Sequence, residues 1–207
     1  ISSLTEPNEE PTTLTETAAH SGVFTGLVQL SDIPTGFNDG AVMIADNDQV
    51  TIRYQDADAG PWGPVNLVKT VPIDCEPPII DNVSVEFIYQ RINMQPSMYA
   101  ALIRFTTKEH TFASVMYGYD CINLWSNASD TVDSDNHLIL LRDLDDNTTY
   151  SFTIHVGDIA GNYAMDDNNG ECHQFVTPPA CEHDNISFDT VIYGCQMGVM
   201  VSMHDCA

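Results

Sequence analysis

Six cysteines, spread along the chain, are the residues with the most distinctive chemistry. None forms a C-x-x-C pair, and neither the ligand spacing of a zinc site nor a haem-attachment motif is present. An even number of scattered cysteines favours disulfides that form in an oxidising compartment. The disulfide candidates are Cys75, Cys121, Cys172, Cys181, Cys195 and Cys206.

Two short acidic loops carry oxygen ligands of the kind that a hard cation such as Ca²⁺ prefers. Asp56 and Asp58 lie in the first loop, and Asp166, Asp167 and Glu171 lie in the second. Neither loop has the full EF-hand pattern D-x-[DN]-x-[DN]-G. Ca²⁺ is the expected cofactor, and the open alternative is that these carboxylates accept hydrogen bonds from the backbone of their own turns. A third, weaker cluster comprises Asp130, Asp133 and Asp135.

The seven histidines and the many serines show no arrangement that is typical of catalysis. The chain has no G-x-S-x-G elbow, no H-E-x-x-H pair and no P-loop. Pairs of carboxylates are frequent because the chain is acidic, so they do not indicate acid–base catalysis. We interpret each histidine as a surface imidazole; the alternative is that His173 and His183, next to Cys172 and Cys181, approach one another and bind a metal. We expect the protein not to be an enzyme.

The charge balance excludes two classes of partner. Six Lys and Arg stand against 30 Asp and Glu, which gives 6 − 30 = −24. Such a surface repels nucleic acid and anionic membranes. No run approaches the roughly 18 consecutive apolar residues of a membrane-spanning helix, so we expect no membrane insertion. Four sequons are compatible with a secreted protein at the cell surface, and they lie at Asn82, Asn127, Asn147 and Asn185.

Short strands separated by polar turns must position these residues. Val50, Ile52 and Tyr54 alternate with polar residues as in a strand that is buried on one face, and residues 150–156 do the same. Turn residues such as 145–147 separate the runs. Hydrophobic residues make up 43% of the chain, which is enough for a folded core. We therefore predict an all-β fold built from β-sandwiches.

The stretch between two proline pairs resembles a fibronectin type III domain over about residues 78–178. Its clearest motif runs from Leu144 to Tyr150 and matches the tyrosine corner L-x-P-x-T-x-Y of that family, with Asp146 where proline is usual. The resemblance implies that the Tyr150 hydroxyl bonds to backbone across the turn while its ring packs in the core. It also implies separate second and third strands at residues 101–107 and 113–118.

The first segment resembles a different, Ig-like module of large secreted bacterial multidomain proteins. Residues 1–75 hold three or four candidate strands, whereas such a sandwich needs about seven. The last segment looks like the opening strands of that same module. The expected domains are an incomplete Ig-like sandwich at 1–75, a fibronectin type III-like sandwich at 76–179, and C-terminal strands at 180–207 that complete the first module.

Three arrangements would bring the C-terminal strands to the first module. They are donor-strand exchange between subunits, tandem repeats cut from a longer chain, and fold-back within one monomer. The first two produce a linear fibre of the protein with itself. The residues expected to enter the first module are Ile186, Phe188, Val199, Val201 and Met203.

The module assignment also implies a pairing of the cysteines, although six cysteines leave other pairings open. A Cys75–Cys195 bond would join tail to head, and the other expected bonds are Cys121–Cys172 and Cys181–Cys206. The leading hypothesis is a structural subunit or repeat of an extracellular filament or surface stalk. The alternative is a non-catalytic adhesion or glycan-binding module of a secreted bacterial hydrolase, which would need exposed aromatic residues such as Trp62 or Trp125.

Overall fold

The computed structural model describes residues 1–57, 60–90, 98–179, 185–188 and 201–204. These residues form strands and one 3-10 turn (Gly60–Trp62), with no α-helix, so the predicted all-β class is confirmed. In the same ranges no helix is long and apolar enough to cross a membrane. The chain divides into a first unit, Ile1–Pro77 with Ile159–Asn162, and a second unit, Pro78–Asp158 with Tyr163–Ala207.

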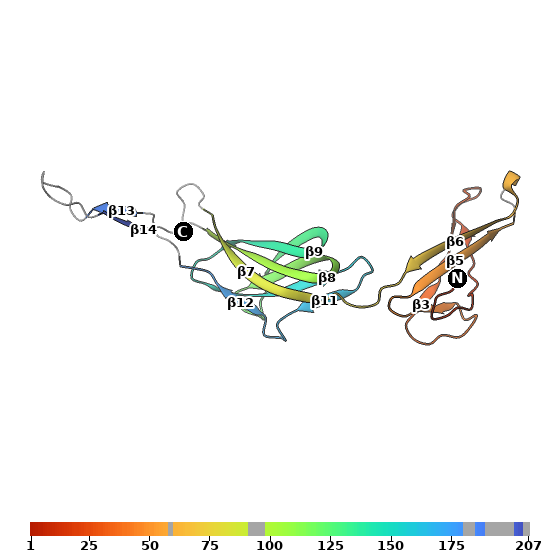
Figure 1. Cartoon of the computed structure of the whole chain (residues 1–207), viewed down its shortest axis with the longest axis horizontal. Helices are drawn as coiled ribbons and strands as arrows, with labels where there is room; N and C mark the ends of the chain where they lie inside the picture. Colours follow the sequence, from red (N-terminus) through yellow and green to blue (C-terminus); the bar gives the residue numbers. More distant parts are fainter. Residues whose placement is uncertain (58–59, 91–97, 180–184, 189–200, 205–207) are drawn as a thin grey trace. The chain divides into compact units, whose positions relative to one another are not determined.

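The second unit contains one antiparallel six-stranded sheet (Figure 1). Its strands are β7 (Ile80–Gln90), β8 (Met98–Gly118), β9 (Ser126–Leu144), β10 (Thr149–Gly157), β11 (Tyr163–Asp166) and β12 (His173–Val176).

The long strand β8 changes its neighbour halfway along its length. Residues 98–107 pair with β7, residues 112–118 pair with β10, and β9 accompanies both halves with register shifts around Thr111. The two separate strands predicted at 101–107 and 113–118 are therefore one strand. The prediction was wrong because the segment between them contains no glycine or proline and includes β-branched Thr111, so nothing interrupts the extended backbone.

A single apolar core lies between the two halves of β8. Ile103 comes from the first half, Val115 from the second, and Leu141 and Ile154 come from β9 and β10. All four side chains are fully buried. Because side chains from both halves meet in one cluster, the arrangement is consistent with a β-sandwich.

Strand β10 is buried on both faces, which corrects the prediction for residues 150–156. Tyr150 and Phe152 are buried as expected, but Ser151 and Thr153 are buried too. β10 has β8 on one edge and both β11 and β12 on the other. Cross-strand neighbours on each face therefore shield its polar side chains, as the hydrogen bond from Gln174 to Ser151 illustrates.

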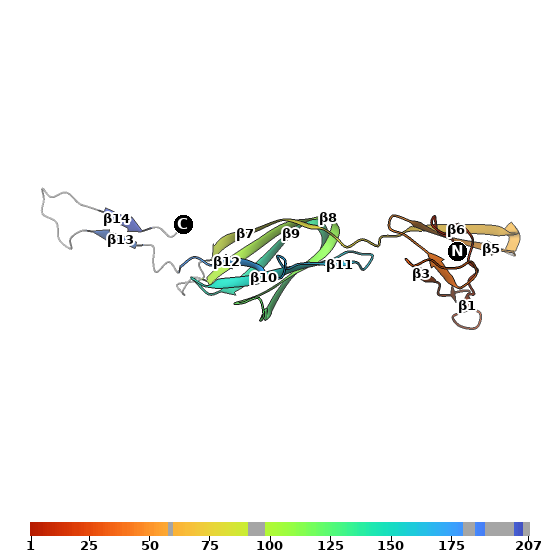
Figure 2. The same cartoon turned by 90° about the horizontal axis from the view of Figure 1, so that it is seen from below.

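The first unit is built from three separate two-stranded sheets (Figure 2). They pair β1 (Thr15–Glu16) with β2 (Phe24–Thr25), β3 (Gln29–Ser31) with β4 (Ala41–Met43), and β5 (Gln49–Asp56) with β6 (Val65–Pro72). Only the β3–β4 pair is parallel among these.

The C-terminal segment forms a two-stranded antiparallel hairpin, in which β13 (Asn185–Phe188) pairs with β14 (Val201–His204). Its register places Ile186 opposite Met203 and Phe188 opposite Val201. These four predicted assembly residues therefore occupy register positions on one face of the hairpin. The fifth predicted residue, Val199, lies outside the described residues.

Candidate functional site

The first unit buries very little apolar surface. Val42 and Val50 are the only apolar side chains that are buried among its described residues. Ile52 and Tyr54 follow Val50 on the face that the alternation predicts to be buried, yet their exposed fractions are 41% and 49%. Other exposed apolar side chains of this unit include Leu4, Leu27, Ile33, Phe37, Leu67 and Val68. The face of β5 that alternation predicts to be buried therefore carries apolar side chains, but no described element covers it.

A groove of about 1020 Å³ runs beside β5 within the first unit. Leu14, Phe24, Ile52 and Tyr54 give it an apolar lining, and Arg53 is paired with Glu9 at 2.5 Å along its border. In the described residues the free edge of β5 makes one bridge, between Thr51 and Ser2. Among the described residues no strand is paired with this edge, so it is open to pairing with another strand.

Polar contacts, in contrast, hold the loops of the first unit in place. The buried carboxylate of Asp48 accepts hydrogen bonds from the N–H groups of Leu4 at 2.8 Å and Gln49 at 2.6 Å. Burial alone would raise the pKa of Asp48, but these bonds and those from Thr5 lower it to about 2. The buried carboxylate of Glu10 likewise accepts from the N–H groups of Asn38 and Gly40. The unit is therefore organised around carboxylates, not around a large apolar core.

The cysteines partly follow the expected pairing. Cys121 and Cys172 form a disulfide within the second unit, with their Cα atoms 5.8 Å apart. Cys75 is exposed and has no disulfide partner in the described part of the chain. Its predicted partner, Cys195, lies outside the described residues together with Cys181 and Cys206. The Cys75–Cys195 and Cys181–Cys206 bonds stay predictions.

The acidic loop after β11 uses its carboxylates for local contacts. Asp166 accepts a hydrogen bond from the N–H of Asn168 at 3.0 Å and contacts His173 Nε2 at 2.9 Å. Asp167 accepts from the N–H of Gly170 at 3.0 Å. Glu171 is exposed. These contacts correspond to the turn-capping alternative, and calcium at this loop stays a prediction. In the other predicted loop Asp56 borders the groove and Asp58 lies outside the described residues.

The predicted tyrosine corner has the geometry that the motif implies. The N–H of Asp145 donates to the Tyr150 hydroxyl at 3.0 Å, and the Tyr150 ring is buried in the core next to Leu144. Burial raises the pKa of Tyr150 to about 12, so the phenol stays neutral. The Asp145 carboxylate also accepts a hydrogen bond from Tyr119 at 2.8 Å.

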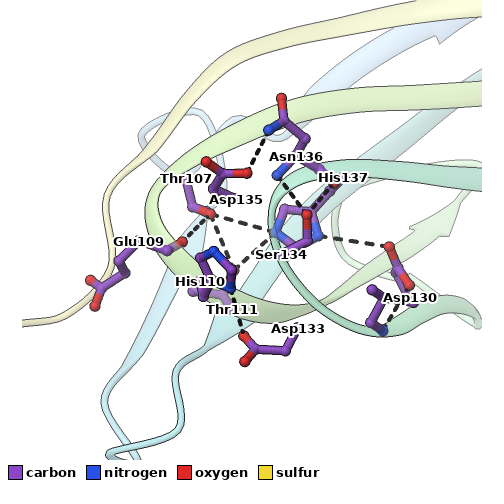
Figure 3. Close-up of polar contacts among 11 residues, drawn as sticks. Thr107, Glu109, His110, Thr111, Asp130, Asp133, Ser134, Asp135, Asn136 and His137 are labelled. Atoms are coloured by element: carbon purple, nitrogen blue, oxygen red, sulfur yellow. Dashed lines mark hydrogen bonds and ion pairs between the residues drawn. The ribbon is translucent and has the colours of Figure 1, made fainter.

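A buried histidine lies between β8 and β9, near the register shift of β8 (Figure 3). The His137 ring stacks on Phe105 with centroids 4.8 Å apart. Its Nε2 atom is 2.9 Å from the Thr111 hydroxyl, and Thr111 is 3.3 Å from the Thr107 hydroxyl. Thr107 in turn donates to the carbonyl of Glu109 at 2.7 Å. These groups form a chain of polar contacts inside an apolar core.

The other ring nitrogen of His137 has no hydrogen-bond partner among the described residues. Its Nδ1 atom is buried and lies 3.9 Å from Asp130 Oδ2. Desolvation lowers the pKa of His137, while the negative charges of Asp130 and Asp135 and the backbone of Ser134 oppose that shift. The neutral imidazole of His137 can take up a proton, because it faces the Asp130 carboxylate. The resulting positive charge would be buried away from water.

Sequence reasoning missed His137, because every histidine was expected at the surface. The signal was available, since His137 alternates with Ile139 and Leu141 along β9. All three side chains point to the core. The nearby cluster of Asp130, Asp133 and Asp135, predicted as a weak cation site, lies around this histidine and the exposed His110, which pairs with Asp133 at 3.8 Å.

Comparison with known proteins does not identify the chain. No family model, no curated protein and no solved structure matches it. The resemblances to fibronectin type III and Ig-like domains therefore stay predictions.

Proposed function

We propose that the chain is a structural subunit of an extracellular filament or surface stalk, assembled head to tail by strand complementation. In this proposal the C-terminal strands of one copy complete the first unit of the next copy. The observation that carries it is the uncovered inner face of β5, where Ile52 and Tyr54 are exposed beside an apolar groove. Self-association is then the biochemical activity, and no catalysis is required.

The energetics of the first unit support the proposal. Fully burying one Val, Leu, Ile or Phe side chain contributes about 1.5–3 kcal/mol. A unit with two buried apolar side chains among its described residues lacks most of that stabilisation. An added strand would cover Ile52 and Tyr54 and would pair the open edge of β5, so main-chain bonds and side-chain burial would form together.

The C-terminal hairpin is a suitable donor. A two-stranded hairpin alone is marginally stable, so β13 and β14 gain from a larger sheet. Their register places Ile186, Phe188, Val201 and Met203 on one face, which is the alternation that an apolar groove selects. The arrangement is also compatible with tandem repeats and with fold-back, and of these only fold-back requires the chain to stay monomeric.

We further propose that the second unit is a fibronectin type III-like sandwich that spaces successive first units. The single apolar core and the Tyr150–Asp145 corner support this assignment, whereas the continuous strand β8 departs from the two separate strands that the resemblance implies. Calcium at residues 166–171 belongs to the proposal as an accessory ion that would reduce repulsion within a chain of charge −24.

Two defective full-length chains test the assembly directly. Phe188→Asp disables the donor strand and leaves the groove intact, whereas Ile52→Asp disables the groove and leaves the donor intact. We expect wild-type protein to form concentration-dependent oligomers in size-exclusion chromatography with light scattering, and each variant alone to be monomeric. Mixing the two variants should produce a heterodimer that grows no further, because each end that remains is disabled.

The matched control is Leu138→Asp, which changes an exposed apolar residue of the second unit. It should assemble like the wild type. A wild-type chain that is monomeric at every concentration, with no heterodimer in the mixture, would establish fold-back and overturn the filament proposal.

A further inference from the structure

The segment that connects β8 to β9 displays three large apolar side chains. The exposed fractions of Tyr119, Ile122 and Trp125 are 52%, 92% and 62%. Single exposed apolar residues are common on protein surfaces, but a contiguous group on one short segment is typical of a binding surface.

Several contacts hold this segment in a fixed conformation. Its Cys121 is bonded to Cys172, and the Asp120 carboxylate accepts from the N–H groups of Ile122 at 2.9 Å and Asn123 at 2.8 Å. The backbone carbonyl of Asn123 also occupies the space where a side chain at Gly118 would lie, so only glycine fits there. The exposed rings are therefore presented in an ordered way, and a ligand would lose little free energy in ordering them.

The two exposed rings form one aromatic surface that is anchored in the core. The Trp125 and Tyr119 ring centroids are 5.6 Å apart with an interplanar angle of 53°. Trp125 also lies 6.1 Å from the buried ring of Tyr117, and Tyr119 lies 5.3 Å from Tyr150. The hydrogen bond from Tyr119 to Asp145 fixes the second ring at its outer end.

Neutral hydrogen-bonding groups flank the tryptophan. Along residues 123–129 exposed and half-buried positions alternate, and the exposed ones are Asn123, Trp125, Asn127 and Ser129. Asn127 is the next exposed residue after Trp125, at the start of β9. Asn123 lies before the strand, and its Nδ2 is 3.4 Å from both carboxylate oxygens of Asp120, so its side-chain carbonyl is the group that is free to bind a ligand. A side-chain amide can donate and accept hydrogen bonds at once, which suits a ligand that is rich in hydroxyl groups.

We propose that this face, composed of Tyr119, Asn123, Trp125 and Asn127, binds a neutral saccharide. One face of a sugar ring is lined by C–H groups that stack on an aromatic ring, while its edge presents hydroxyls to the flanking amides. A net charge of −24 disfavours anionic polysaccharides. The site lies in the second unit and is independent of the groove, so this binding activity goes beyond the proposed assembly.

The test uses full-length protein with Trp62→Phe, which leaves Trp125 as the only tryptophan, and with Phe188→Asp, which keeps assembly from contributing. Production in a host that adds no N-linked glycan leaves Asn127 free. The probes are cellohexaose, maltohexaose, laminarihexaose and yeast mannan, titrated with fluorescence detection and checked by calorimetry. We expect a saturable change with at least one probe, at a Kd in roughly the micromolar to millimolar range.

Three further substitutions locate the site. Trp125→Ala, followed by calorimetry, should weaken binding by at least about tenfold, and Asn123→Ala and Asn127→Ala by about threefold or more. Trp125→Phe keeps a ring and should retain part of the affinity, which guards against misfolding of the alanine variant. Leu138→Ala, at an exposed position further along β9, should leave the affinity unchanged.

Two results would overturn the saccharide site. One is the absence of a saturable response to all four probes in folded protein. The other is unchanged affinity in the Trp125→Ala variant. If the Trp125→Ala substitution in the otherwise wild-type chain reduces oligomer size while no sugar binds, the aromatic face contacts a second copy and the proposal fails. The heterodimer experiment is read separately, so failure here leaves the assembly proposal standing.

Discussion

At the scale of single residues, the Tyr150 hydroxyl links a turn to the core. It accepts a hydrogen bond from the partly buried N–H of Asp145, while its ring lies fully buried. Replacement by phenylalanine keeps the ring and leaves that N–H without its partner. We expect Tyr150→Phe to lower the free energy of unfolding of the second unit by about 1–2 kcal/mol in urea titrations. The control Tyr119→Phe removes a more exposed hydroxyl and should cost less; an equal loss in both variants would contradict the assignment.

His137 should make the stability of the second unit depend on pH. Burial lowers its pKa in the folded state, so its stabilising contribution is complete above the unfolded pKa of about 6.5 and is lost as the pH falls. The negative charges that act on His137 are those of Asp130 and Asp135 on β9. His110 on β8 and its partner Asp133 are the other titratable groups nearby.

The measurement is urea unfolding at several pH values between 7.5 and 5. The wild type should lose stability toward the lower pH, and His137→Gln should remove part of that loss, because burial also lowers the pKa of His155. His110→Gln, an exposed histidine, serves as the control and should keep the wild-type slope. If stability instead rises as the pH falls, the Asp130 carboxylate outweighs desolvation and His137 is protonated in the fold.

Tyr150 and His137 differ in how far their contacts could be predicted from the sequence. Tyr150 could be placed because its partner lies five residues away in a recognisable motif. The burial of His137 could be predicted from alternation, but its partners Thr107 and Thr111 could not, because strand pairing brings them to it from 30 and 26 residues away. A local motif carries its own geometry, whereas a buried polar network depends on register, which composition does not specify.

At the scale of elements, the Cys121–Cys172 bond ties the β8–β9 connection to the loop before β12. The two residues are 51 positions apart, so the bond closes a long loop. Replacing both cysteines by serine should lower the free energy of unfolding of the second unit by about 3–4 kcal/mol on the chain-entropy scale. Reductant should act similarly on the wild type and have a smaller effect on the double variant, which keeps only the predicted Cys75–Cys195 and Cys181–Cys206 bonds. Equal stability with and without the bond would show that local contacts alone hold the connection.

Strand positions were largely predictable, because alternation of apolar and polar residues has a period that local sequence carries. Which faces of those strands are buried was harder to predict. Ser151 is shielded by neighbours that join β10 from distant parts of the chain, and Ile52 is exposed because no described strand covers it. Periodicity specifies which residues share a face, but neighbouring elements decide whether that face is covered.

At the scale of the whole molecule, the proposed assembly brings together chains that each carry a charge of −24. Like charges oppose association, and salt reduces this repulsion over a Debye length that falls from about 30 Å at 0.01 M to about 10 Å at 0.1 M. We therefore expect the association of wild-type chains to strengthen as NaCl rises from 10 to 300 mM, with faster growth of light scattering and a lower critical concentration. The burial of Ile52 and Tyr54 by the donor strand does not weaken with salt, so the net trend follows the repulsion.

The donor-disabled variant Phe188→Asp separates this effect from folding. It stays monomeric, so its thermal midpoint reports only the repulsion within one chain, and a rise with salt there measures the intramolecular part. The wild type should show that rise together with the increase in oligomer size. Assembly that weakens as salt is added would mean that attractive charge contacts hold the copies together. The surface that binds the neighbouring copy would then include Arg53, Lys69 and their neighbours along β5 and β6, and not the apolar groove.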